Sequence, residues 1–272
     1  MPDLVADLAR ALGIADVRAL VMWFGLALAR AVPAMYFNPF LGGASVPAPA
    51  RMGVGAAFAL LMWPMLVDAS AIAPGPVEYM ALFAKEIIIG FGMGLFTTII
   101  FAGFTAAGHI IDTQRGANTA ESMLYQQHER TSVLGSLLFQ MAVVLFLAMG
   151  GHLYYLQILG YSYKMIPLAV FPAVTGNAWT DSAFIVRQSG QIFAIGVQLA
   201  APAMLLILLV DVGLAFVSRM APQLDVYFLG MPIKTLVGLG VLLLLLPALA
   251  DLMTGISIDA LHDLKFKLTG RR

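Results

Sequence analysis

Six long apolar stretches restrict this 272-residue chain to a membrane-embedded helical fold. A helix that crosses the hydrocarbon layer needs about 20 mostly apolar residues. The candidate stretches are residues 19–37, 52–67, 87–107, 133–149, 192–210 and 235–249. Hydrophobic residues make up 61% of the chain and charged residues 11%, whereas a soluble domain averages about 25% charged residues. We therefore predict a polytopic, all-α membrane protein.

Composition also excludes several kinds of site. The net charge is zero, so the chain has no electrostatic footprint for nucleic acid. Cysteine is absent, which excludes disulfides, thiolate metal sites and thiol nucleophiles. No hydrophilic block is large enough for a soluble domain, and we expect no cleavable signal. We expect residues 1–272 to form a single membrane-embedded domain, with a flexible basic tail from about 255 to 272.

A polar island, residues 109–130, interrupts this apolar pattern. It contains five of the chain's 30 charged residues and two of its four histidines. Such a concentration is typical of a loop held in water or of a polar element packed inside a membrane protein. The choice between these two interpretations decides what the island does.

Three charged residues inside or beside the apolar stretches are functional candidates, because an ionisable group in a membrane is costly. Arg30 lies in the first stretch, ahead of Pro33. We expect it to pair with another helix or with a partner subunit. Lys85 and Glu86 precede the third stretch, where Glu86 either caps a helix N-terminus or, with Lys85, contacts a subunit.

Two further patterns concern packing. Gly90 and Gly94 are four residues apart, which lets a neighbouring helix approach closely. The connection 150–191 is rich in aromatic residues and contains Pro167 and Pro172, as is typical of a re-entrant or interfacial segment.

Patterns that would support catalysis are incomplete. His128-Glu129 begins like a zinc-protease helix, but Ser132 stands where the second histidine is required. The sequence contains no nucleophile elbow and no phosphate-binding loop. His109 and Asp112 have the spacing of an acid–base pair, although such a pair is more often structural. A small-solute transporter is the stronger alternative, yet no apolar stretch contains a central acidic residue.

Residues 211–238 carry the most distinctive pattern, with Arg219, Pro222, Gln223, Asp225, Gly230, Pro232, Lys234 and Gly238 in fixed order. This segment resembles the C-terminal signature of the FliR/SctT family, export-gate proteins of bacterial type III secretion. Arg30 and Pro33, Asn38-Pro39, Arg51, and Lys85-Glu86 with Gly90 resemble earlier family motifs in the same order. The resemblance covers nearly the whole chain.

The polar island distinguishes the two branches of this family. Asp112-Thr113-Gln114-Arg115-Gly116 is similar to the Asp-x-Gln-Arg-Gly pattern of the injectisome member, SctT. The flagellar member, FliR, typically has an apolar Gly-x-Gln-Met-Gly there. The resemblance therefore favours the injectisome branch.

The resemblance implies a fold and a set of partners. The expected fold is an all-α integral membrane protein of about six hydrophobic helices, arranged as tilted hairpins in a hetero-oligomeric export gate. The implied partners are membrane subunits of the FliP/SctR and FliQ/SctS types, the FlhB/SctU-type switch protein, and unfolded secreted proteins. The implied location is the bacterial inner membrane, partly raised above the bilayer. We expect no catalytic residues, cofactor or metal.

Two groups of site residues follow from the resemblance. A pore-plugging loop corresponds to about 112–123, with Asp112, Gln114, Arg115, Gly116, Ala117, Asn118, Glu121 and Met123. An ordinary solvated connection is the alternative. Subunit-interface or hairpin roles are expected for Arg30, Lys85, Glu86, Arg219, Pro222, Gln223, Asp225 and Lys234. Pro222 and Pro232 should each interrupt helix, and Arg219 and Asp225 are spaced to pair across a turn.

Overall fold

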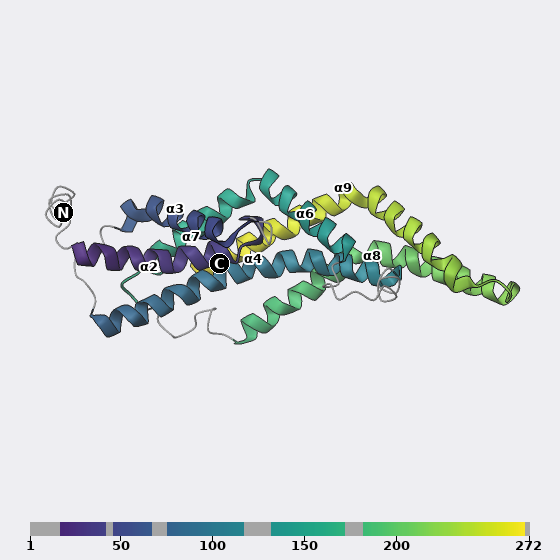
Figure 1. Ribbon diagram of the computed structural model, residues 1–272, viewed down its shortest axis with the longest axis horizontal. Helices are drawn as coiled ribbons and strands as arrows, with labels where there is room; N and C mark the ends of the chain where they lie inside the picture. The colour runs from purple at the N-terminus through teal and green to yellow at the C-terminus, as the bar shows by residue number, and fades with distance from the viewer. Residues whose placement is uncertain (1–16, 42–45, 67–74, 117–131, 172–181, 270–272) are drawn as a thin grey trace. The chain divides into compact units, whose positions relative to one another are not determined.

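The computed structural model describes residues 17–41, 46–66, 75–116, 132–171 and 182–269, and every regular element in these ranges is helical (Figure 1). The elements are α2 (Val17–Tyr36), the 3-10 helix η1 (Pro39–Leu41), α3 (Ala48–Leu66), α4 (Pro76–Gln114), α6 (Val133–Ala148), α7 (Gly151–Met165), α8 (Ser182–Met220) and α9 (Val226–Thr269). The prediction of an all-α fold is confirmed for the described part of the chain.

The greater part of each of the six apolar stretches lies in a separate helix, namely α2, α3, α4, α6, α8 and α9. Three of these helices are much longer than their apolar stretch. α4 and α8 contain 39 residues each, and α9 contains 44. At about 1.5 Å per residue they extend about 58–66 Å, roughly twice the thickness of the hydrocarbon layer.

Three helical segments are long and apolar enough to cross a membrane: Pro76–Gln114, Gly190–Met220 and Val226–Leu244. A fourth span is added if α6 and α7, on either side of the break at Gly150, count as one broken span. The chain is therefore an all-α membrane protein. α7 lies in the connection 150–191, and its re-entrant or interfacial position stays a prediction.

At the C-terminal part of the chain, α9 continues to Thr269 and includes Pro232 and Pro247. The flexible basic tail from about residue 255 stays a prediction. The prediction that Pro232 interrupts a helix is wrong. Proline is tolerated within membrane helices, because neighbouring groups satisfy the backbone carbonyl that loses its hydrogen-bond donor.

The described helices form two compact units. The first contains α2, α3, the N-terminal part of α4, α7 and the end of α9. The second contains the C-terminal part of α4, α6, most of α8 and α9 as far as residue 260. α4 contributes to both units. The organisation of residues 1–272 as a single domain stays a prediction.

The first unit is built on a close approach of α2 to α4. A Cβ atom added at Gly90 would lie 2.2 Å from the Arg30 carbonyl oxygen, and one at Gly94 would lie 2.9 Å from Phe37 Cβ. The close packing predicted from these two glycines is confirmed. α7 is joined to α2 by two buried tyrosines: Tyr155 donates a hydrogen bond to the Ala34 carbonyl (3.0 Å), and Tyr163 donates one to that of Ala27 (2.8 Å).

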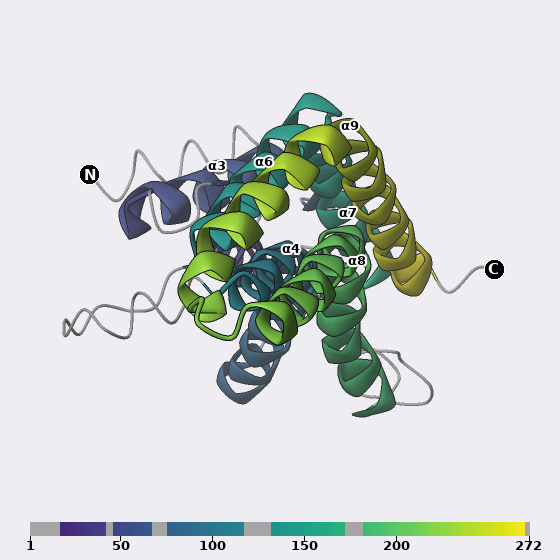
Figure 2. The same ribbon diagram turned by 90° about the vertical axis from the view of Figure 1, so that its right-hand side faces the viewer.

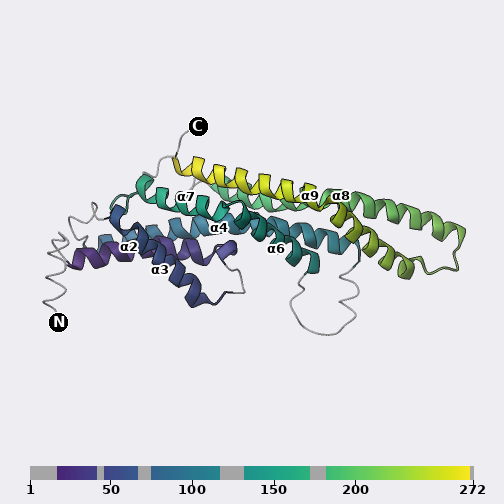
Figure 3. The same ribbon diagram turned by 90° about the horizontal axis from the view of Figure 1, so that it is seen from above.

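In the second unit α6 lies against the C-terminal part of α4 (Figure 3). A Cβ atom added at Gly108 of α4 would lie 2.2 Å from the Gly135 amide nitrogen of α6, so the two backbones are in direct contact. On α8, Ile195 packs against Gly103. α8 and α9 then form a long antiparallel hairpin, whose turn faces the viewer in Figure 2.

Large apolar side chains are exposed along this hairpin. Leu209 is 70% exposed, and Leu243 and Leu244 are 72% and 82% exposed. Exposed apolar area of this kind marks a surface covered by lipid or by other proteins. The hairpin therefore presents a membrane or subunit surface and not a water-facing one.

Candidate functional site

The two most distinctive sequence segments line one cavity. Its volume is about 410 Å³, and it lies in the second unit between the end of α4 and the α8–α9 hairpin. Its lining residues include Thr113, Gln114, Arg115, Asp211, Tyr227, Met231 and Lys234. The Arg115 side chain passes Gly238, whose added Cβ atom would lie 4.0 Å from Arg115 Cδ. The polar island and the C-terminal signature thus meet in space.

Asp112 is the buried centre of the described part of the island. Its side chain is only 3% exposed. Asp112 Oδ1 accepts a hydrogen bond from Arg115 Nε at 2.8 Å and lies 2.6 Å from Arg115 Nη2. Asp112 Oδ2 accepts hydrogen bonds from Ser132 Oγ and from the Leu134 amide nitrogen, the latter at 3.1 Å. Asp112 and Arg115 therefore form a buried ion pair, as expected of a polar element packed inside a membrane protein.

These contacts place the start of the predicted plug differently from the expectation. Asp112 and Gln114 belong to the last turn of α4, and only then does the chain leave the helix. Gly116 has φ +79°, a left-handed conformation that glycine adopts without strain and that commonly ends helices. Ala117, Asn118, Glu121 and Met123 lie outside the described residues. The plug role of all eight residues stays a prediction.

Both oxygens of Asp112 are used by Arg115 and by the start of α6. The acid–base pair with His109, suggested by the spacing, is therefore not formed, and His109 is exposed. Among the described residues no group of three or more metal-binding side chains comes together.

The α8–α9 hairpin carries an ion pair that the sequence did not predict. Lys234 of α9 pairs with Asp211 of α8, and both side chains are partly exposed. Asp225 does not pair with Arg219 in the described structure. It caps α9 instead, accepting a hydrogen bond from the Phe228 amide nitrogen at 3.4 Å. Pro222 and Gln223 lie in the turn, as expected, and Arg219 is exposed in the last turn of α8.

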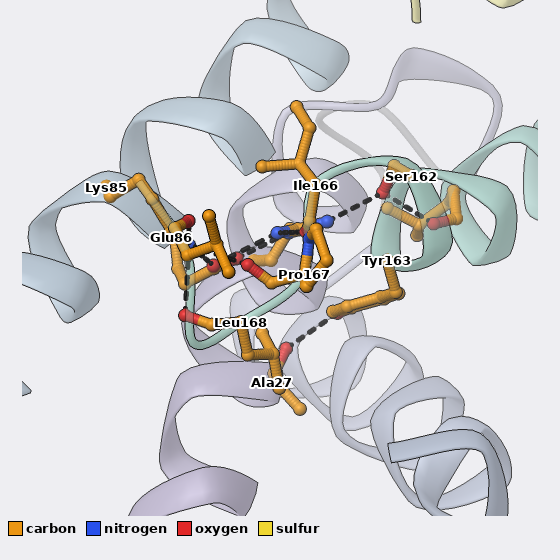
Figure 4. A network of polar contacts seen from close by, with 11 residues as sticks. Ala27, Lys85, Glu86, Ser162, Tyr163, Ile166, Pro167 and Leu168 are labelled. Carbon is orange, nitrogen blue, oxygen red and sulfur yellow. Dashed lines mark hydrogen bonds and ion pairs between the residues drawn. The ribbon is translucent and has the colours of Figure 1, made fainter. Parts of the chain in front are cut away.

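The first unit contains a second polar cluster, formed by Arg30, Lys85 and Glu86. Figure 4 shows Lys85 and Glu86 of this cluster together with Ser162 and Ile166. Arg30 and Glu86 are fully buried and pair through Nε to Oε2 and through Nη2 to Oε1, the second contact at 3.0 Å. Arg30 also donates to Ser162 Oγ at 3.2 Å and to the Ile166 carbonyl at 2.8 Å. The prediction that Arg30 pairs with another helix is confirmed.

Lys85 completes this cluster with a cage of four oxygens. Its Nζ lies 2.8 Å from Glu86 Oε1 and donates to the carbonyls of Pro167, Leu168 and Val170 at 2.9–3.0 Å. These carbonyls follow the end of α7, where the helix dipole favours a cation. Capping of the α4 N-terminus by Glu86 is wrong, because α4 begins at Pro76. An additional subunit contact of Arg30, Lys85 or Glu86 stays a prediction.

Sequence reasoning missed Ser132, Ser162 and Asp211. Ser132 has a recognisable signal, since a serine immediately before an apolar run is a typical N-cap. Its Oγ accepts a hydrogen bond from the Gly135 amide nitrogen at 2.7 Å. The partners of Ser162 and Asp211 are far away in the sequence, so no local sequence pattern marks these two residues.

Comparison with known proteins assigns this architecture to a family. The family model described as "Bacterial export proteins, family 1" matches residues 21–259. The chain is 37% identical to the Yop proteins translocation protein T of Yersinia pestis over 185 residues, covering 68% of this chain and 70% of the relative. It is 30% identical to the flagellar biosynthetic protein FliR of Pectobacterium carotovorum over 80% of this chain and 83% of the relative. It is 29% identical to the surface presentation of antigens protein SpaR of Salmonella typhimurium over 90% of this chain and 91% of the relative.

Proposed function

We propose that this chain, which belongs to the bacterial export proteins, family 1, is a non-catalytic subunit of the inner-membrane export gate of a type III secretion apparatus. Unfolded proteins pass through such a gate, and the segment at about 112–123 plugs it when it is closed. The partners are membrane subunits of the FliP/SctR and FliQ/SctS types and the FlhB/SctU-type switch protein. Membership of this family favours an export-gate subunit over the alternative function, a small-solute transporter.

One observation carries the plug assignment. α4 is a single 39-residue helix that ends in the polar island. Buried contacts of Asp112 fix the position of this helix end. A solvated connection requires no such anchor, whereas a plug must be held against the wall of the pore. Small residues at positions 116, 117 and 120 suit a narrow bore. The Asp112–Gly116 pattern and the 37% identity to a Yop translocation protein favour the injectisome branch.

Deletion of residues 116–120 tests this function. In the assembled complex the deletion should raise the resting ion conductance well above background while leaving the yield of the complex unchanged. The measurement is conductance in a planar bilayer, with a dye-leak assay in vesicles beside it. Deletion of residues 173–177 removes five residues from another connection and serves as the matched control. Background conductance in the 116–120 deletion would disprove the plug.

Arg219 provides a test of assembly. It is exposed and forms no ion pair among the described residues, so its charge is available to another subunit. Arg219→Glu should lower the yield of co-purified partner subunits several-fold, whereas the amount of chain in the membrane fraction stays the same.

Lys164→Glu is the matched control for Arg219→Glu, because Lys164 is also an exposed basic residue in the last turn of a helix. Like Arg219→Glu, it places an acidic residue at a helix C-terminus, which is unfavourable. It differs from Arg219→Glu in the surface that it changes. Equal losses of complex in the two variants would contradict an interface role specific to Arg219.

A further inference from the structure

A single carboxylate joins the two helix ends that flank residues 117–131. Asp112 belongs to the last turn of α4, and its Oδ2 accepts hydrogen bonds from Ser132 and Leu134 at the start of α6. Arg115, one helical turn along, holds Oδ1. The end of α4 and the start of α6 are therefore fixed to each other directly, through buried side-chain contacts.

The charge of this carboxylate is required by its surroundings. The first backbone amides of a helix have no partner within the helix, and Asp112 satisfies that of Leu134 while Ser132 satisfies that of Gly135. A negative group also interacts favourably with the positive end of the α6 dipole. Asparagine has nearly the same shape, but its NH2 group is a hydrogen-bond donor. It would face one of the donors that bind the Asp112 carboxylate. Buried donors facing a donor lose their hydrogen bonds.

The backbone around Asp112 leaves little freedom for another arrangement. Gly108 and Gly135 bring α4 and α6 into backbone contact one turn from the carboxylate. Position 116 then turns the chain out of α4 with a left-handed conformation. Direction and separation of the two helix ends are both set within these few residues.

We propose that Asp112 is the positioning residue of the closed gate. Its carboxylate fixes the start of α6 to the end of α4, and the gate seals only while these ends are held. The inference rests on the proposed plug function, and it adds a specific role for the charge of Asp112 and for its bond to Ser132.

Two variants test the role of Asp112 in the assembled complex. Asp112→Asn should raise the resting conductance about tenfold, since loss of hydrogen bonds to a buried charged group shifts a local equilibrium by at least that factor. Ser132→Ala removes one donor, leaves α4 intact and should give a smaller increase in the same direction. Asp251→Asn, the same change at an exposed position of α9, is the control and should leave conductance unchanged.

A distance measurement distinguishes positioning from general destabilisation. The chain has no cysteine, so cysteines introduced at Thr113 and Val133 are its only labelling sites. Both positions are exposed, on either side of the Asp112 contact. Spin labels there should give one narrow distance distribution, which broadens in Asp112→Asn while the helical content of the chain stays the same.

The outcomes separate this proposal from the plug itself. Wild-type conductance and an unchanged distance distribution in both Asp112→Asn and Ser132→Ala would overturn the positioning role. If the complex with residues 116–120 deleted still shows raised conductance, the plug function stands without the positioning role. If the conductance of that deletion variant also stays at background, the plug function fails and the positioning role fails with it.

Discussion

Replacement of Glu86 by glutamine is expected to destabilise the protein by about 3–5 kcal/mol, the cost of removing one partner from a buried ion pair. Within the described part of the chain Glu86 is the single acid paired with the two cations Arg30 and Lys85, and its side chain is fully buried. Glutamine keeps the shape of the side chain but leaves two buried positive charges without a counter-charge. The free energy of unfolding in detergent, compared with that of the wild type, measures the effect.

Variants of the two cations should cost less than Glu86→Gln. Arg30→Met leaves Glu86 paired with Lys85, and Lys85→Met leaves Glu86 paired with Arg30. In each case one acid faces one base, so the cluster becomes neutral. Glu86→Gln should also cost less in the Arg30→Met background than alone, because only one cation then loses its partner.

The matched control for Glu86→Gln is Glu78→Gln in the same helix. Glu78 lies in the first turn of α4 and is exposed, so the same change there should have little effect. Equal stability of the Glu86→Gln and Glu78→Gln variants would show that the buried cluster does not hold α2, α4 and α7 together.

Much of this fold follows from the sequence, for an identifiable reason. Backbone polar groups in an apolar environment must be satisfied within the helix, so each long apolar run predicts one helix. The same cost of burial marked Arg30 and Glu86 as residues in need of partners. Gly90 and Gly94 likewise predicted the close approach that the structure shows between α2 and α4.

The ends of the helices were less predictable. Asp112 and Gln114 look like loop residues because they are polar, yet they continue α4. Burial of Asp112 is tolerated only because Arg115, Ser132 and Leu134 satisfy it, and two of these partners lie about 20 residues away in the sequence. Pro232 was misjudged for a related reason, since the neighbours that support a proline inside a helix are not visible locally.

Pairing partners could not be derived from the sequence. Arg30 and Glu86 are 56 residues apart, and either could have met a different charge or another subunit. Asp211 and Lys234 become neighbours only because α8 and α9 form a hairpin with a short turn. Sequence patterns show that a charge needs a partner, but three-dimensional packing selects it.

Replacement of Gly108 by alanine is expected to be the most damaging single-methyl change in the second unit. A Cβ atom at this position would lie 2.2 Å from the Gly135 amide nitrogen and 2.3 Å from Gly135 Cα. Backbone atoms of a helix cannot rotate away as a flexible side chain can, so α4 and α6 must separate. Overpacking of this kind costs about 1–3 kcal/mol or more, although alanine favours helix over glycine by about 1 kcal/mol.

The same substitution at Gly213 reverses the sign and serves as the control. Gly213 lies within α8, and an added Cβ atom there would meet nothing within 4 Å. Gly213→Ala should therefore stabilise the protein by about 0.5–1 kcal/mol through helix propensity alone. Thermal unfolding in detergent should place Gly108→Ala below the wild type and Gly213→Ala above it. A Gly108→Ala variant as stable as Gly213→Ala would rule out backbone contact between α4 and α6, and with it the geometry that brings Ser132 to Asp112.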